Sequence, residues 1–419
     1  MLDINRLRED PTGVERRLQT RDPSIRVAEI LVLDKTRRSL IQEVEVLKAQ
    51  RNRGSQQVAD LKQQGKDATE LIASLSSVAA QIATLDSRLK KTTSKIDHLL
   101  SLLPNVPHPD VPVGTKEERV ELRSFNERPH ADFPVKPHLE IGEEKGLLDF
   151  RRGAAIAGSR FPMYVGMGAR LEMALIAFMF FHHVARGYVP IIPPFVANSN
   201  SFFVASQLPK FAEDSYHCEK DDLWLNPTAE SLLANLHRDE ILDEETLPRN
   251  FVGYTPCFRR EAGTYGEDER GLIRVHQFNK VELFKYTSQE TSYAELDGLV
   301  ADAESVLQAL GVHYRVTLLP TQDLAQQSSK TIDLEVYLPA QGRYYEVSSC
   351  SNCETFQARR GNTRYRPAAG GKPQFVHMLN GSGLATSRLT AAILENNQTQ
   401  DGEICIPEVL QEMVGAQTL

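Results

Sequence analysis

Apolar residues within the first hundred positions recur at alternating intervals of three and four residues. The clearest run consists of Leu71, Leu75, Val78, Ile82, Leu85, Leu89, Thr92, Ile96, Leu99 and Leu103. An earlier run consists of Leu33, Leu40, Val44, Leu47, Val58 and Leu61, with Arg37, Arg51 and Gly54 as exceptions. Because this spacing places one apolar stripe along a helix, it predicts two helices that pair through their stripes. Gly65 and its polar neighbours predict the turn, so we expect an antiparallel hairpin of two helices of about 35 residues each.

The pattern changes at Pro104, where four prolines within nine residues prevent a helix and predict a stiff connector. Beyond it, helical patterns such as Leu171–Ala185 and Leu384–Asn396 alternate with strand-like runs. The strand-like runs are Tyr188–Ile192, Phe251–Tyr254, Ile273–Phe278, Tyr314–Leu319 and Thr331–Leu338. They are not spaced as regular strand–helix–strand units, so the sequence predicts an α+β fold with an antiparallel sheet. We expect an N-terminal helical domain over 1–104, a proline-rich linker over 105–118 and a mixed domain over 119–419.

Composition supports this division and limits the function classes. All 30 aromatic residues (1 Trp, 12 Tyr and 17 Phe) lie at or after Phe125, so the N-terminal segment cannot build an ordinary globular core. The net charge of −8 excludes an overall basic nucleic-acid coat. Five scattered cysteines do not suggest a disulfide framework, and no apolar run reaches the roughly 20 residues of a membrane helix. Asp3 and Arg6 argue against a signal peptide, so we expect a cytoplasmic protein without a membrane segment.

The helical arm differs in charge from the rest of the chain. Residues 34–98 hold 12 Lys or Arg and 8 Asp or Glu, which is +4, and the remainder therefore carries −8 − 4 = −12. Such charges are compatible with a solvated coiled-coil surface. They are equally compatible with an arm that touches a phosphate backbone through a few basic side chains. Composition alone leaves both interpretations open.

Common nucleotide and metal signatures are absent from the sequence. There is no GxxxxGK[ST] stretch, and Gly381-Ser382-Gly383 lacks the third glycine and the βαβ context of a dinucleotide site. Cys350 and Cys353 form a CxxC pair, but no second pair stands at zinc-ribbon distance, so no zinc is expected. Buried free thiols are the simpler interpretation of these two residues.

Two polar stretches carry the candidate chemistry. Thr255–Gly263 and Asp268–Phe278 predict two strands joined by a polar loop, with Arg259, Arg260 and Glu261 in a strand interior. Such charges are costly to bury unless they meet charged ligands, and the arginine fork suits carboxylate and phosphate oxygens. Ser382 is expected to be the N-cap of the helix Leu384–Asn396, with Arg388 about one turn into that helix. Because arginine there opposes the helix dipole, the sequence predicts an anionic partner or a salt bridge.

These stretches resemble the three signature motifs of class II aminoacyl-tRNA synthetases, and the whole chain resembles bacterial-type seryl-tRNA synthetases. Motif 1 is matched by Leu171–Ala185 with Gly187–Phe195, motif 2 by Phe258–Glu261 through Phe278, and motif 3 by Gly383–Arg388. Other similar stretches are Gln207–Phe211, Pro227–Glu230, Glu346–Asn352 and Phe356–Arg360. The resemblance implies a coiled-coil tRNA-binding arm followed by a class II catalytic domain, built on an antiparallel sheet flanked by helices.

The resemblance also implies an activity and partners. The family converts L-serine and ATP to seryl-adenylate and transfers serine to the 3′ end of tRNA(Ser). The sequence leaves open whether tRNA(Sec) is also serylated. Motif 1 lies at a two-fold interface in this family, and residues 171–181 are apolar on nearly every helical face, so we expect a homodimer.

Site residues follow from the resemblance position by position. The implied catalytic residues are Arg259, Glu282 and Arg388. The implied L-serine site consists of Thr228, Ala229, Glu230, Arg259, Glu282, Asn380 and Ser382. The implied ATP site consists of Arg259, Arg260, Glu261, Val275, His276, Gln277, Phe278, Glu346, Val347, Ser348, Ser349 and Arg388. Glu346 and Ser349 are the implied ligands of Mg²⁺.

Within these sets, the resemblance gives particular residues particular roles. Arg259 would hold the α-phosphate, Phe278 would stack on adenine, and Arg388 would reach the γ-phosphate and the other adenine face. A buried Glu282 that accepts a hydrogen bond from the serine hydroxyl would penalise alanine, because the carboxylate would stay unpaired. Threonine would have to be rejected by crowding.

The sequence departs from the usual family pattern in three places. Ser231-Leu232-Leu233 replaces Val-Pro-Leu, Ser387 replaces a glycine before the motif 3 arginine, and Leu324–Lys330 replaces a more common Gly-Phe-Ser-Ala-Ala-Lys. None of these changes removes an implied ligand.

Two other functions have to be weighed. A paralogue that has lost catalysis could act as an RNA- or protein-binding module, but it would be expected to lack Arg259, Glu282 or Arg388. An enzyme that activates an amino acid for a carrier protein would lack the arm and carry zinc ligands. ATP–pyrophosphate exchange, run with each amino acid, separates the enzymes from the binding protein.

Overall fold

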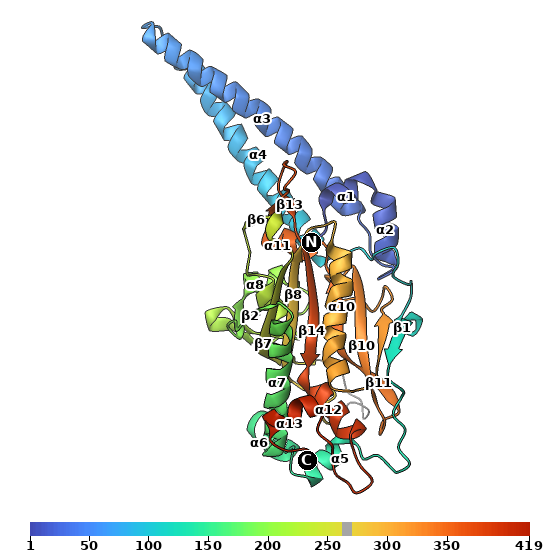
Figure 1. The fold of residues 1–419 in the computed structure, drawn as a ribbon. Helices are drawn as coiled ribbons and strands as arrows, with labels where there is room; N and C mark the ends of the chain where they lie inside the picture. The colour runs from blue at the N-terminus through green and yellow to red at the C-terminus, as the bar shows by residue number, and fades with distance from the viewer. Residues whose placement is uncertain (262–269) are drawn as a thin grey trace. The chain divides into compact units, whose positions relative to one another are not determined.

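The computed structural model describes residues 1–261 and 270–419. The chain forms two compact units, shown in Figure 1. The first contains residues 2–19 and 23–103, and the second contains Met1, residues 20–22 and residues 104–419. Each unit is described separately below.

The first unit is helical throughout. Two short helices, α1 (Ile4–Glu9) and α2 (Pro11–Gln19), precede α3 (Ala28–Gln63) and α4 (Thr69–Leu102). α3 has 36 residues and α4 has 34, and they lie side by side as a hairpin (Figure 1). Gly65 has a φ of +68° at the turn, a conformation that glycine adopts without strain. The expected hairpin and its turn are confirmed.

The residues of the two apolar runs are buried or half-buried, and two of the exceptions to their spacing have a physical reason. Gly54 is buried, and a Cβ atom there would lie 2.5 Å from Cδ2 of Leu75. The small residue therefore makes room for a leucine of the facing helix. Asp34, which the spacing did not single out, is buried and pairs with Arg8, Arg37 and Arg38 at 2.9, 2.6 and 3.2 Å. Arg37 therefore interrupts the apolar spacing because it pairs with the buried carboxylate of Asp34.

An eight-stranded sheet forms the centre of the second unit. Its strand order is β1-β9-β10-β11-β14-β8-β7-β2. The bounds are β1 (Val120–Phe125), β2 (Val189–Ile191), β7 (Arg249–Phe258), β8 (Gln277–Thr287), β9 (Tyr314–Leu318), β10 (Lys330–Leu338), β11 (Arg343–Asn352) and β14 (His377–Ala385). All neighbouring strands are antiparallel except β2 and β7, which are parallel. The expected antiparallel α+β fold is confirmed.

Three long helices cover one face of this sheet: α7 (Met167–Ala185), α10 (Ser292–Ala309) and α12 (Thr386–Asn396). Alternate residues of β8 show why the face of the sheet away from these helices is polar. Val281 and Leu283 belong to the buried core with Leu175, whereas Lys280 and Glu282 line a cavity. Because successive strand residues point to opposite faces, β8 packs the core and builds the cavity at once.

Smaller elements surround this framework. The short helices are α5 (His138–Glu144), α6 (Phe150–Ala157), α8 (Ser199–Val204), α9 (Glu230–Leu233), α11 (Phe356–Gly361) and α13 (Glu408–Val414), with η1 (Lys116–Glu118), η2 (Glu219–Asp221) and η3 (Glu244–Thr246). Two small sheets are β13-β12-β6 (Gln374–Phe375, Arg364–Arg366, Ile241–Asp243) and β3-β5-β4 (Val196–Asn198, Leu223–Leu225, His217–Cys218). No helix in the described ranges is both long and apolar enough to cross a membrane.

The proline-rich segment after residue 104 is held along the second unit. The backbone N–H groups of Asn105 and His108 donate to the carbonyl oxygens of Gln326 and Ser329, both at 2.8 Å. The carbonyl of Pro112 accepts a bond from Thr321 at 2.9 Å. Asn105, His108 and Pro112 of this segment therefore bond to the loop that precedes β10.

Three local expectations were wrong. β7 ends at Phe258, so Arg259, Arg260 and Glu261 follow the strand instead of lying inside it, which spares the sheet their burial. β8 begins at Gln277, so residues 273–276 are not strand. Ser382 lies within β14 and is not an N-cap; α12 begins at Thr386, and Arg388 falls in its first turn. The loop expected between the two motif 2 strands falls on 262–269, outside the described residues.

Candidate active site

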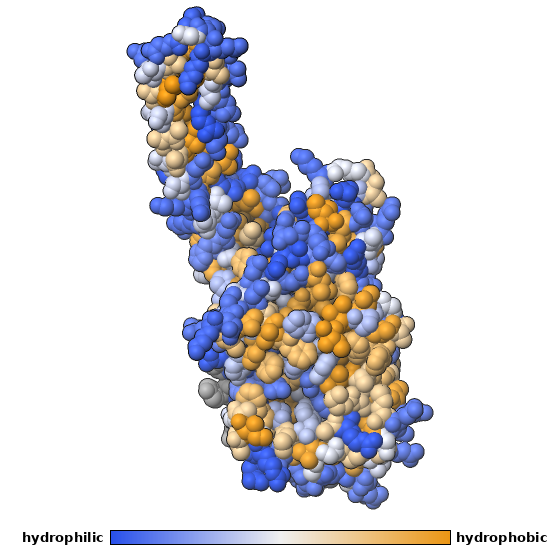
Figure 2. Space-filling model, turned by 90° about the vertical axis from the view of Figure 1, so that its left-hand side faces the viewer, coloured by the Kyte–Doolittle hydropathy of each residue, from blue (hydrophilic) through white to orange (hydrophobic). Residues whose placement is uncertain are grey.

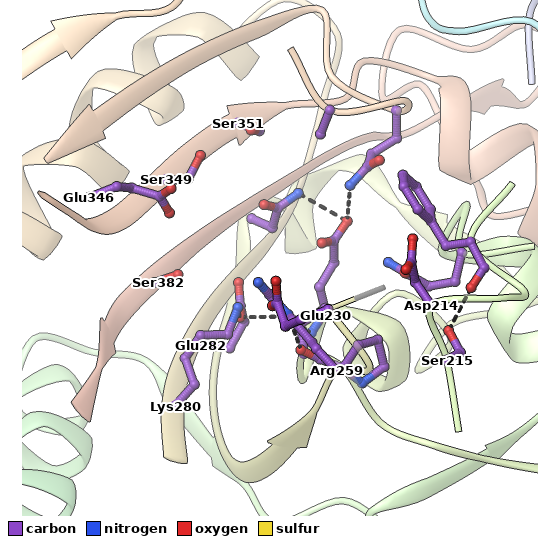
Figure 3. Close-up of a pocket in the computed structure, with 18 of the residues that line it drawn as sticks. Asp214, Ser215, Glu230, Arg259, Lys280, Glu282, Glu346, Ser349, Ser351 and Ser382 are labelled. Carbon is purple, nitrogen blue, oxygen red and sulfur yellow. Dashed lines mark hydrogen bonds and ion pairs between the residues drawn. The ribbon is translucent and has the colours of Figure 1, made fainter. Parts of the chain in front are cut away.

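A cavity of about 490 Å³ opens on the face of the sheet opposite α7 and α10 (Figure 3). Its walls come from the end of β7, from β8, β11 and β14, and from the segments that precede α9 and β10. The lining residues include Thr228, Glu230, Arg259, Glu261, Glu282, Glu346, Ser349, Asn380 and Ser382 from the implied sites. Residues separated by more than 150 positions in the chain thus share one hollow.

A hydroxyl–carboxylate pair lies at the floor of the cavity. Oγ1 of Thr228 donates to Oε2 of Glu282 at 2.8 Å, and both side chains are buried. Lys280, two residues before Glu282 on β8, forms an ion pair with the same carboxylate. The pair offers acceptor oxygens to a small polar ligand, and the ion pair with Lys280 holds the Glu282 carboxylate in place.

Glu230 stands beside this pair and is held by side-chain amides. Oε1 of Glu230 accepts hydrogen bonds from Gln357 at 2.7 Å, Gln327 at 2.9 Å and Asn380 at 3.2 Å. Burial, together with the negative charge of Glu282, raises the pKa of Glu230 to about 7. The amide donors act in the opposite direction, because they stabilise the carboxylate form.

Two successive arginines after β7 point to different places. Nε of Arg259 donates to the carbonyl oxygen of Pro227 at 3.3 Å, and its guanidinium lies 5.1 Å from the ring centre of Phe278. Its remaining donors face the cavity, which it lines. The guanidinium of Arg260 instead lies 5.9 Å from the ring centre of Tyr216, and its backbone N–H donates to Asp214. Arg260 is not among the described residues that line the cavity.

A smaller cavity of about 80 Å³ adjoins the first and has a flat aromatic wall. It is lined by Phe278, Val275, Val347, Ala385 and Arg388, with Arg259 and Glu261 shared between the two. Nε of Arg388 donates to the carbonyl oxygen of Ile273 at 3.1 Å, and Arg274 donates to Oε2 of Glu261 at 2.5 Å. A slot between a phenyl ring and a guanidinium suits a planar heteroaromatic base.

Oxygen ligands gather at the β11 wall. Glu346 and Ser349 both line the large cavity. Asp333 lies opposite Ser349 in the neighbouring strand, and its Oδ1 is buried without a hydrogen-bond partner among the described residues. Burial and the charge of Glu346 raise the pKa of Asp333 well above its usual range. Carboxylate and hydroxyl oxygens of this kind fit a hard divalent cation such as Mg²⁺.

Some implied site residues do not reach the cavities. Ala229 is packed in a core cluster, and Oγ of Ser348 donates to the backbone oxygen of Ser382 at 2.6 Å. His276 contacts the backbone oxygen of Arg259 through Nδ1 at 3.0 Å, and Gln277 is exposed at the start of β8. None of these four residues lines either of the two cavities.

Several lining residues were missed from the sequence. They are Gln207, Phe211, Asp214, Ser215, Pro227, Arg274, Lys280, Ala325, Gln327 and Ser351. Lys280 could have been found by continuing the predicted strand beyond Phe278, because Lys280 and Glu282 are two residues apart and would then share one face. Gln327 could not, because nothing in its segment indicates that it reaches Glu230.

Comparisons with known proteins agree with this geometry. Residues 214–397 match the family described as tRNA synthetase class II core domain (G, H, P, S and T), and residues 1–107 match the seryl-tRNA synthetase N-terminal domain. The chain is 52% identical over 420 residues to the serine--tRNA ligase of Heliobacterium modesticaldum, covering 100% of both chains. It is 50% identical to that of Geobacillus kaustophilus, covering 99% of each.

Solved structures are similar over the full chain. The seryl-tRNA synthetase from Pyrococcus horikoshii complexed with ATP has a TM-score of 0.93 at 37% identity, covering 100% of this chain and 99% of that one. The cytoplasmic serine-tRNA ligase from Naegleria fowleri in complex with AMP has a TM-score of 0.87 at 30% identity, covering 100% and 98%. With both domains matched and relatives near 50% identity over their whole length, the chain belongs to the seryl-tRNA synthetase family of class II aminoacyl-tRNA synthetases.

Proposed function

We propose that the large cavity carries out both steps of the serine--tRNA ligase reaction of this family. In the first step a carboxylate oxygen of L-serine bonds to the α-phosphorus of ATP, and pyrophosphate leaves. In the second, a hydroxyl at the 3′ end of tRNA(Ser) attacks the seryl carbonyl carbon, and AMP leaves. The observation that carries the proposal is the convergence of Thr228, Glu230, Glu282 and Arg259 on one hollow beside an aromatic slot.

The floor of the cavity recognises serine. Glu282 accepts the substrate hydroxyl, and the 2.8 Å bond from Thr228 fixes the position of its carboxylate. Glu230 receives the α-ammonium group. Alanine has no hydroxyl to donate, so its binding would leave the carboxylate oxygen of Glu282 that Thr228 and Lys280 do not contact buried without a hydrogen-bond donor.

Arg259 acts at the α-phosphate, where negative charge develops in the transition state. Its guanidinium faces the same cavity as Glu230 and Glu282, so it can hold the serine carboxylate and the α-phosphate together. A fixed donor at the reacting phosphate needs no reorganisation in the transition state, which is why electrostatic terms of this kind are large. The reaction needs positioning and neutralisation and no covalent nucleophile.

The adjoining slot receives ATP. Phe278 stacks on the adenine, Val275 and Val347 flank it, and Arg388 covers the other face and reaches the distal phosphates. Glu346 and Ser349 hold Mg²⁺, and Asp333 stands behind Ser349 in the next strand. The cation, when bound, neutralises charge on the phosphate oxygens.

The proposal also covers tRNA binding by the arm, a cytoplasmic location and a homodimer. The +4 arm binds tRNA(Ser), with tRNA(Sec) as a further substrate to be tested. The five free cysteines suit the reducing cytoplasm.

Hydrophobic side chains gather on one face of the second unit (Figure 2), and Met173 and Phe181 of α7 are 62% and 64% exposed. We assign this face to a homodimer interface, because exposed apolar patches mark docking sites.

ATP–pyrophosphate exchange with each of the twenty amino acids tests the proposal. We expect strong exchange with serine, weak exchange with threonine and alanine, and background with the rest. Aminoacylation of tRNA(Ser) should follow with the same preference. If no amino acid supports exchange while the protein binds tRNA, the chain is a binding paralogue and the proposed catalytic roles are wrong.

A further inference from the structure

Oε1 of Glu230 accepts several hydrogen bonds, whereas Oε2 accepts none from the residues that the structure describes. Gln357 at 2.7 Å and Gln327 at 2.9 Å saturate the two lone pairs of Oε1, and Asn380 approaches at 3.2 Å while sharing its amide with Sγ of Cys353 at 3.4 Å. Figure 3 shows the dashed contacts meeting on one end of the Glu230 carboxylate. The rotamer of Glu230 is therefore fixed by donors that all lie on one side.

Gln327 is itself held in place from behind. Nδ2 of Asn105 donates to the backbone oxygen of Gln327 at 2.9 Å and to that of Cys353 at 2.9 Å. Asn105 is buried, and its own backbone N–H bonds to Gln326 at 2.8 Å. The amide of Gln327 thus reaches Glu230 from a backbone that is anchored at two successive residues.

We propose that Gln327 is a positioning residue for L-serine: its amide group holds Oε1 of Glu230, so that Oε2 is presented to the α-ammonium group of the substrate. This inference rests on the proposed function. Gln327 stands where the more common family segment, aligned on Lys330, has serine, which is too short to span the same gap. The chain therefore supplies this donor from a segment in which it departs from its family.

The donor also affects the charge of Glu230. From β8, Glu282 raises the pKa of Glu230 and Lys280 lowers it; Cys353, after β11, adds no charge because burial raises the pKa of its thiol. Gln327 and Gln357 lower the pKa of Glu230, which burial raises to about 7. Loss of one donor destabilises the carboxylate form, so the pKa of Glu230 rises further. Binding of an ammonium group then requires a higher pH.

The test compares Gln327→Leu with Gln326→Leu, a matched change at the neighbouring glutamine, whose side chain accepts a bond from Lys210 at 3.1 Å. Serine-dependent pyrophosphate exchange is measured from pH 6 to 9. For Gln327→Leu we expect KM for serine to rise about tenfold at neutral pH, since a hydrogen bond to a charged group is lost. KM for ATP should stay within about twofold, and the acid limb of kcat/KM for serine should move to higher pH. Gln326→Leu should not move that limb.

A double-mutant cycle supplies the second measurement. The Kd of a seryl-sulfamoyl adenosine analogue is measured for Gln327→Leu, Glu230→Gln and the double variant. Gln327→Leu should weaken binding in the parent and add nothing in the Glu230→Gln background, because the two residues act as one unit. If Gln327→Leu does not fold, Gln327→Ser takes its place in both measurements.

The outcomes separate the two claims. Equal effects of Gln326→Leu and Gln327→Leu, or an additive cycle, overturn the role of Gln327 while the proposed function stands. A parent enzyme without serine-dependent exchange, or a Glu230→Gln variant that binds the analogue as well as the parent, overturns the proposed function itself.

Discussion

Nη1 of Arg388 donates a 2.7 Å hydrogen bond to the backbone oxygen of Glu346 and lies 3.7 Å from Oε2 of the same residue. The motif 3 arginine therefore rests beside one of the two proposed Mg²⁺ ligands. When ATP and Mg²⁺ bind, a phosphate group can pair with Arg388 and the cation can pair with Glu346. Both side chains then exchange their 3.7 Å contact for a stronger charge-assisted contact. This relationship supports the proposal that Arg388 acts on the nucleotide and not on serine.

Replacement of Arg388 by alanine should therefore act on ATP. We expect KM for ATP to rise by about tenfold or more, since part of this interaction is made in the ground state, and KM for serine to change little. Pyrophosphate exchange at saturating serine and varied ATP measures it. Arg388→Lys should fall between, because it keeps the charge but loses the planar fork. A rise in KM for serine alone would place the arginine elsewhere.

Arg259 and Arg260 make a natural pair for the next experiment. Arg259 lines the cavity, whereas the guanidinium of Arg260 lies over Tyr216. Arg259→Ala should lower kcat by roughly 100-fold, as removal of a transition-state donor does, and Arg260→Ala should have a much smaller effect. Steady-state pyrophosphate-exchange kinetics of both variants measure these changes in kcat. Comparable losses of kcat would contradict the division of roles that the geometry indicates.

The difference between these arginines also shows what sequence reasoning can reach. The helical hairpin and the antiparallel sheet were predictable, because they follow from periodicity and from the spacing of whole elements. The direction of a side chain just past a strand end was not, since it depends on which neighbours the folded chain supplies. Ser382 was misplaced for a related reason: β14 continues through the glycines to Ala385, where pairing with Lys280 ends.

The amides around Glu230 show a second limit. Gln327 lies 97 positions from Glu230 and Gln357 lies 127, and no short-range pattern connects them. The resemblance supplied the ligand residues, but it could not supply a partner that this chain places in a segment of its own. Gly54 is the opposite case, where an exception in a pattern has a local explanation in the opposing Leu75.

Glu282 should control the discrimination of serine from alanine. Glu282→Ala removes the acceptor for the substrate hydroxyl, so kcat/KM for serine should fall by about 100-fold or more, while the weak activity with alanine changes little. Glu282→Gln keeps an acceptor oxygen but leaves Lys280 without its ion partner, so it should lose activity with both amino acids. Exchange assays with the two amino acids measure the ratio. An unchanged serine-to-alanine preference in Glu282→Ala would place the hydroxyl elsewhere.

The proposed homodimer depends on the exposed apolar face that includes α7 and the residues after β2. Phe181 is 64% exposed and Ile192 is 75% exposed. A Phe181→Asp/Ile192→Asp double variant should be monomeric by sedimentation at micromolar concentration, because charges cannot be buried in an apolar interface without partners. Val32→Asp, on the arm and 66% exposed, is the matched control and should leave the dimer intact. A parent protein that sediments as a monomer removes the basis of the proposal.

The two half-reactions should separate when the arm is shortened. Lys48 of α3 pairs with Asp86 of α4 at 3.4 Å, so residues 49–85 form the hairpin beyond this pair. Their replacement by a Gly-Ser-Gly turn removes no residue that lines either cavity. Serine-dependent exchange should therefore remain within about twofold of the parent, whereas kcat/KM for tRNA(Ser) should fall by about 100-fold or more as phosphate contacts are lost.

Charge variants of the full-length arm show whether these contacts are electrostatic. Lys90 and Lys91 are exposed on α4, and Glu43 and Glu45 are exposed on α3. Lys90→Gln/Lys91→Gln should raise KM for tRNA(Ser) and flatten its dependence on salt, because fewer counterions are released on binding. Glu43→Gln/Glu45→Gln, which changes the charge by the same amount in the opposite direction, should not raise KM. If the shortened arm loses exchange while the protein remains folded and dimeric, or if both charge variants behave alike, the arm does more than hold tRNA.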